Sequence, residues 1–215
     1  MKSVFETVKE IKQSFRLMMD GAVAQSMRDK GLNYHLNWGA TLPRLQAKAQ
    51  EIKAMFNDSS LMFNVYELSI ALWKENVREC KILATMLMPP DEILPEVVDI
   101  WQEQIPSQEI AEQLAFNLYQ HLPFAAEKAY QWIASDKEYD QLCGFHVLSR
   151  LFMNGQEPNE RGINEYLDEA LCALQGPYPS VRKAALQSLQ RFAELGLLYE
   201  RLAKSATKSI DLDIF

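Results

Sequence analysis

The chain has 215 residues, of which 48% are apolar and 24% charged, and this is the composition of a globular protein. The formal net charge of −7 argues against a uniformly basic nucleic-acid binder. No apolar run reaches the roughly 20 residues needed to span a bilayer. The first twenty residues mix charged and apolar side chains, unlike a signal peptide, so we expect a cytoplasmic protein without membrane contact.

Apolar residues recur at helical spacing from the first residues of the chain. A first amphipathic helix is expected from Val4 to Met19, and a short second helix ends at Gly31. A loop rich in aromatic and amide groups follows. Thr41 and Pro43 then open a helix that runs to about Asn57.

Capping residues and prolines divide the rest of the chain into further helices. Asp58 to Ser60 cap a helix that reaches Trp73, and the helix beginning at Asn76 stops before Pro89. The remaining expected helices are Glu92–Trp101, Pro106–Leu122, Pro123–Ile133, Ser135–Phe152, Gly162–Leu174, Ser180–Leu195 and Leu197–Lys204. Residues 205–215 are expected to form a C-terminal tail.

A recurring half-pattern indicates how these helices pack. Val77-Arg78 and Val181-Arg182 each open a helix with small and aliphatic residues at helical spacing, which is typical of the second helix of a HEAT repeat. Short linkers place consecutive helices side by side, and each pair buries its apolar stripe only by stacking on the next. The predicted fold is therefore an all-α solenoid of HEAT-like antiparallel helix pairs in a single domain, residues 1–204.

Charge is unevenly distributed along the chain. Residues 27–55 contain five basic and two acidic residues, and residues 177–208 contain six basic and two acidic residues. Residues 91–140 contain eleven acidic residues against two lysines. The basic ends suit phosphate groups and the acidic middle suits a basic protein segment.

Motifs for cofactor and metal chemistry are missing from the sequence. Neither GxGxxG nor GxxxxGK[ST] occurs, and no Ser, His and Asp stand in a recognisable nucleophile arrangement. Cys80, Cys143 and Cys172 are widely spaced within apolar helical patterns, so we expect reduced, buried thiols. We predict no cofactor and no metal site.

Four segments resemble a known family. The first element of the resemblance is Gly39-x-x-Leu42-Pro43-Arg44-Leu45, and the second is Leu72-Trp73 followed by Arg78-Glu79-x-Lys81-Ile82-Leu83-Ala84. Trp132 to Asp136 and Val181 to Ala185 fit later repeats of the same family. Together they resemble the HEAT-like DNA alkylation repair family over about residues 31–195.

The resemblance implies a duplex-DNA-binding fold. Characterised members excise cationic N-alkylated purines, hold the duplex on a concave face, and direct a carboxylate at the developing oxocarbenium sugar, with two tryptophans and an arginine around the lesion. This chain departs from the family at all four corresponding positions, which are Glu109, Gln113, Leu142 and Gln187.

Loss of that carboxylate has a large expected effect. A unit charge about 4 Å from a cation contributes roughly 4 kcal/mol at an effective dielectric near 20, which is on the order of 10³-fold in rate. Gln113 is neutral and cannot supply this energy. Glu109 and Glu112 share one helix face and are the candidate catalytic carboxylates, with a solvated acidic stripe as the alternative interpretation.

Three functions fit these observations. The resemblance favours a DNA-binding protein whose glycosylase chemistry is lost or altered, and the predicted contacts are Arg78, Lys81, Arg150, Arg182 and Lys183. For Arg78 and Arg182, bonds within the protein are the alternative role. The other two functions are a protein-interaction scaffold for a basic segment and an active alkylpurine glycosylase that uses Glu112.

Overall fold

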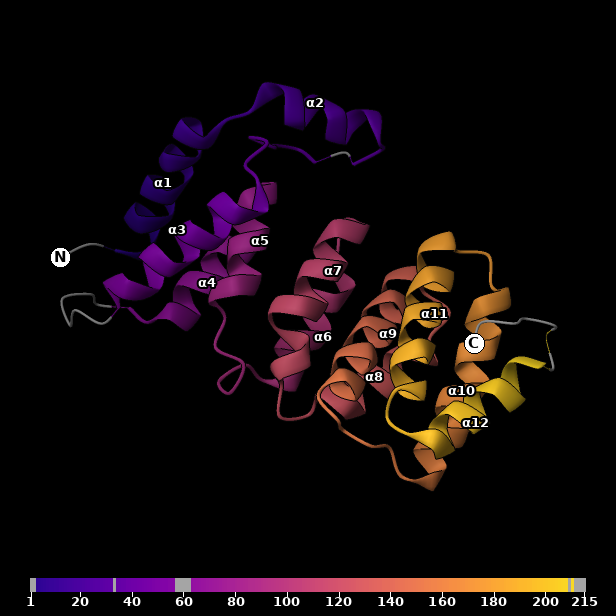
Figure 1. Cartoon of the computed structure of the whole chain (residues 1–215). Coiled ribbons are helices and arrows are strands. Elements are labelled where there is room, and N and C mark those ends of the chain that lie inside the picture. The colour runs from indigo at the N-terminus through magenta and orange to yellow at the C-terminus, as the bar shows by residue number, and fades with distance from the viewer. Residues whose placement is uncertain (1–2, 33, 57–62, 209, 211–215) are drawn as a thin grey trace. The chain divides into compact units, whose positions relative to one another are not determined.

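The computed structural model describes residues 3–32, 34–56, 63–208 and 210. All regular elements of these residues are helices, and a single isolated bridge pairs Leu36 with Val77. The chain divides into two compact units, with the boundary between Ile100 and Trp101. Figure 1 shows the helices of both units. The expected single domain of residues 1–204 stays a prediction, and each unit is described by itself.

The first unit contains α1 (Val4–Phe15), α2 (Gly21–Asp29), α3 (Leu42–Met55), α4 (Val65–Lys74) and α5 (Arg78–Leu87), with a short 3-10 turn, η1 (Arg16–Met18), after α1. Here α1 packs on α4, and α5 packs on both α3 and α4. The helix α6 (Pro95–Glu103) contains the boundary between the units.

Helix ends in the first unit follow local capping chemistry. Ser3 and Glu6 form a reciprocal capping box at the start of α1, and Asn64 and Glu67 form another at α4. The cap expected at Asp58 to Ser60 lies outside the described residues, which resume at residue 63.

The second unit consists of two layers. Its helices are α7 (Gln108–Asn117), η2 (Tyr119–His121), α8 (Ala125–Ile133), α9 (Glu138–Met153), α10 (Glu160–Gln175), α11 (Pro179–Ala193) and α12 (Leu197–Lys208). The helix α9 packs against α7 on one side and α11 on the other, while α8 lies against α9 and α10 (Figure 1). One layer is therefore α7, α9 and α11, and the other contains α8 and α10.

Two boundaries in this unit differ from the sequence prediction. The helix expected through Leu122 ends at Asn117, because Leu118 leaves helical geometry with φ −126° and ψ −60° and the chain continues as η2. The last helix continues four residues beyond Lys204 to Lys208, so the expected tail begins as helix.

Burial accounts for the tryptophans and for most of the thiols. Trp73, Trp101 and Trp132 are all buried in the core. Cys80 and Cys143 are buried as predicted, whereas Cys172 is exposed because it lies on the solvent side of α10. None of the described helices is both long and apolar enough to cross a membrane.

Candidate nucleic-acid interface

The layer of α7, α9 and α11 presents one face to the second layer and the other to solvent. Gly144 marks the inward side of α9, where a Cβ would lie 2.7 Å from Ile133 Cγ2 and 2.9 Å from the Ala129 carbonyl oxygen of α8. His146 is two positions further on, about 200° around the helix, and Arg150 is one turn beyond it. His146 and Arg150 therefore lie on the side of α9 that faces away from α8.

Four side chains from three helices gather on this outward side. The Arg150 guanidinium lies over the Phe116 ring of α7, 4.7 Å from its centroid. The His146 ring meets the same phenyl ring edge to face, with centroids 4.9 Å apart. Lys183 of α11 is exposed and close enough to act electrostatically on His146. Phe116, His146, Arg150 and Lys183 are called the basic cluster below.

The pKa of His146 reflects both the burial of the ring and the positive charge around it in the basic cluster. The pKa of His146 is lowered from 6.5 to about 4, first by burial and then by the positive charges of Arg150 and Lys183. His146 is therefore a neutral ring at pH 7, and the positive charge of the cluster comes from Arg150 and Lys183. Within the described residues, neither of these two side chains forms an ion pair.

Two of the five predicted contacts are used inside the first unit. Arg78 is 1% exposed, and its guanidinium donates to the Ala40 carbonyl at 2.8 Å and to Glu79 at 3.2 Å. Lys81 donates to the Trp73 carbonyl at 2.9 Å and lies over that indole ring, and burial lowers its pKa. Of the two roles considered for Arg78, its burial fits the structural one, and a guanidinium so buried is not available to a phosphate.

Glu79 completes this buried network. One of its oxygens accepts from the backbone N–H groups of Trp38 at 3.1 Å and Ala40 at 3.2 Å. The Arg78-Glu79 motif thus holds the segment that precedes α3 against the start of α5. In this chain the motif is part of the scaffold.

Arg182 is also engaged within the protein. It is half-buried, and its guanidinium donates to the Gly176 carbonyl at 2.6 Å, which fastens α11 to the preceding turn. Of the predicted contacts, Arg150 and Lys183 are the two that both act on His146, and Lys183 is exposed while Arg150 is half-buried.

The candidate carboxylates lie on α7 in the same layer. Glu109, Glu112 and Gln113 are half-exposed and share the stripe of Phe116, at three- and four-residue spacing. Glu112 accepts a hydrogen bond from the Gln108 amide at 2.8 Å, and Gln113 accepts one from Asn117 at 3.1 Å. The stripe is a solvated polar face with one aromatic ring at its C-terminal end.

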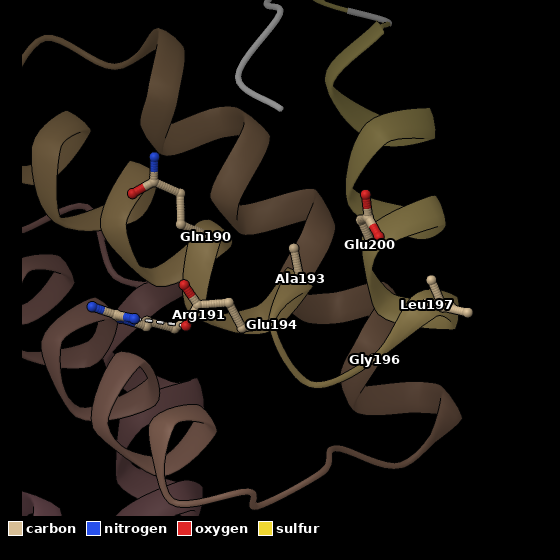
Figure 2. Close-up of a pocket in the computed structure, with 7 residues that line it drawn as sticks. All are labelled: Gln190, Arg191, Ala193, Glu194, Gly196, Leu197 and Glu200. Carbon is tan, nitrogen blue, oxygen red and sulfur yellow. Dashed lines mark hydrogen bonds and ion pairs between the residues drawn. The ribbon is translucent and has the colours of Figure 1, made fainter.

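A hollow of about 720 Å³ lies at the corner between α11 and α12. Figure 2 shows Arg191 directed to Glu194, an ion pair at 2.6 Å, with Leu197 and Glu200 coming from α12. Glu200 in turn pairs with Lys204 at 2.5 Å. Because its charges compensate one another, this hollow is a weaker candidate for an anion than the basic cluster.

The family model for DNA alkylation repair enzymes matches residues 11–194 of the sequence. The chain belongs to this family. The predicted family is therefore confirmed, and the described helices confirm the predicted all-helical fold. No curated protein matches the sequence.

A solved structure supports the same fold. It comes from a family of proteins related to the HEAT-like repeat DNA glycosylases, with affinity for branched DNA structures. The TM-score is 0.78 at 16% sequence identity, with 94% of this chain and 82% of that chain covered. At this identity the likeness carries the HEAT-like fold and no more.

The four positions that the resemblance predicts to correspond to the family's catalytic residues differ in environment. Leu142 is 1% exposed, so it belongs to the core and does not face a ligand. Gln187 is exposed on α11, and Glu109 and Gln113 are half-exposed on α7. The assignment of Gln113 to the position of the family's catalytic carboxylate rests on the sequence resemblance and stays a prediction.

Sequence reasoning missed two members of the basic cluster, Phe116 and His146. An aromatic residue at helical spacing is usually a core residue, and His146 is 9% exposed. A usable signal was present, because Phe116 falls three and four residues after the polar positions Gln113 and Glu112. That spacing turns the ring toward the polar stripe.

Proposed function

We propose that this protein binds DNA through the outward face of α7, α9 and α11, with Arg150 and Lys183 contacting backbone phosphates. The observation that carries the proposal is the pair of cations in the basic cluster, neither of which forms an ion pair with a carboxylate of the described residues. Elsewhere in the same unit, Arg161, Arg191 and Lys204 each form an ion pair at 2.5 to 2.7 Å.

The charge of α11 supports this choice of face. Between Pro179 and Ala193 the helix carries three basic residues and no acidic residue. A phosphate contacted by Lys183 or Arg150 releases condensed counterions, and this release drives binding most strongly at low salt. An anionic ligand is therefore the partner that this face fits best.

We further propose that glycosylase chemistry is lost or altered. The side chain at 113 is a neutral amide, and Glu112 is hydrogen-bonded to Gln108. A protein that binds DNA without cleaving the glycosidic bond is consistent with these groups. The affinity of the structural neighbour for branched DNA structures makes a four-way junction a useful second probe beside a duplex.

The test is a salt titration of DNA binding. Fluorescence anisotropy of a labelled duplex and a labelled junction is measured for the wild type, for Arg150→Gln, for Lys183→Gln and for the double variant. Each lost phosphate contact lowers the slope of log K against log salt by about 0.9, so the double variant is expected to lose roughly 1.8. Arg161→Gln, on α10, is the matched control and is expected to bind as the wild type does.

The proposal fails if neither DNA shifts at low salt, or if Arg161→Gln weakens binding as much as the double variant. Catalysis is tested separately by incubating the protein with methylated duplex DNA. No free base is expected above a no-enzyme control. Release that Glu112→Gln abolishes would instead establish a rearranged catalytic site.

A further inference from the structure

A second hollow lies on the opposite layer of this unit, between α8 and the start of α10. It has a volume of about 410 Å³, where liquid water occupies about 30 Å³ per molecule. Its rim carries Glu127, Glu157 and Glu165, and Arg161 is the one basic residue that lines it. Each of these four rim residues is exposed.

The floor of the hollow is apolar. A narrower slot shares Ala126, Tyr130 and Pro158 with the hollow and reaches the buried side chains of Leu148 and Phe152. The shape is therefore an apolar base beneath a ring of carboxylates.

The carboxylates on the rim outnumber the positive charge available to them. Arg161 is already bonded to Glu165 at 2.7 Å, and Glu157 is held from α12 by the Tyr199 hydroxyl at 2.9 Å. Glu127 has only an exposed amide, 3.5 Å away, as its hydrogen-bond donor. Among the described residues, Glu127 and Glu157 thus have no cationic partner.

The surrounding helix adds to this negative charge. Residues 154–175, which contain α10, carry five acidic residues and one arginine. Burial raises the pKa of Glu169, and the neighbouring Asp168 carboxylate raises it further. The two helices of the last pair are thus oppositely charged, α10 acidic and α11 basic.

We propose that this hollow docks a basic segment of a partner protein, with one arginine or lysine side chain inserted. The aliphatic stem would lie on Ala126 and Pro158 while the cationic head reaches Glu127 and Glu157. Charge complementarity selects this occupant, because DNA would be repelled by the same rim. The inference is independent of the proposed DNA-binding face.

The experiment measures binding of a fluorescein-labelled, arginine-rich peptide to the full chain by anisotropy. Glu127→Gln and Glu157→Gln each remove one rim charge and are expected to weaken binding roughly three-fold, and together about ten-fold. Ala126→Leu fills the hollow without changing any charge, and is also expected to weaken binding several-fold. Glu96→Gln, which removes an exposed carboxylate on α6 of the first unit, is the matched control and is expected to have no effect.

Tyr199→Phe removes the hydrogen bond from Tyr199 to Glu157 but keeps the Glu157 carboxylate. It therefore separates the effect of the charge of Glu157 from the effect of holding that carboxylate in place. We expect it to retain most of the peptide affinity. The proposal is overturned if the peptide does not bind, if Glu96→Gln weakens binding as much as the rim variants, or if Ala126→Leu has no effect.

Discussion

Acidification should destabilise this protein through His146. Its pKa is lowered from 6.5 to about 4 in the folded chain, first by burial and then by Arg150 and Lys183. Between these two values the unfolded chain binds a proton that the native chain does not, so stability is lost as the pH falls through this window. From pH 7 to pH 5 the loss attributable to this group is about 2 kcal/mol.

The assay is urea denaturation at pH 7 and pH 5 for the wild type and for His146→Gln. Carboxylates contribute equally in both proteins, so the difference between the two pH dependences isolates the histidine. We expect the loss between pH 7 and pH 5 to be smaller in the variant by about 2 kcal/mol. Equal losses in the two proteins would refute the assignment of a buried neutral ring.

Three further predictions concern packing and reactivity. Gly144→Ala should lower the free energy of unfolding by about 2 kcal/mol, because its new methyl group meets α8 and the gain in helix propensity recovers only about 1 kcal/mol. Thermal melting measures this loss, with Gly21→Ala as the control because a methyl group there meets nothing within 4 Å. Tyr166→Phe removes a buried hydroxyl that donates to Ser188 Oγ at 2.9 Å, and it should lower the free energy of unfolding by about 1 kcal/mol in the same melts. In native protein at pH 8 a thiol reagent should label Cys172 but not Cys80, because Cys80 is buried and its pKa is raised to about 12. Mass spectrometry of the two peptides measures the labelling, and equal reaction of both thiols would contradict the assignment.

The helix pairs could be predicted from the sequence because their signals are local. Ser107 accepts from the N–H of Ile110 at the start of α7, and Pro179 occupies the first turn of α11, as the capping pattern indicates. The break at Leu118 depends on a backbone conformation that no local residue type demands. Boundaries of that kind were therefore placed less well than the helices themselves.

The roles of the arginines could not be predicted, because they depend on distant segments. Arg78 and Arg182 follow a valine in nearly the same sequence pattern, and each donates to a backbone carbonyl. The segment around Ala40 covers Arg78 completely, whereas Arg182 stays half-exposed. The burial of Arg78 is set by residues about forty positions earlier in the chain, so the Val-Arg motif alone does not reveal it.

The opposite charges of α10 and α11 have a consequence for the approach to DNA. A molecule with a net charge of −7 is repelled by a polyanion at distances where its individual charges are not resolved. At closer range, for the DNA-binding face proposed above, the asymmetry between the two helices would favour encounters in which α11 faces the phosphates and α10 faces away from them. Collisions in other orientations would then be unproductive, so the charge asymmetry would act on the orientation of the first contact.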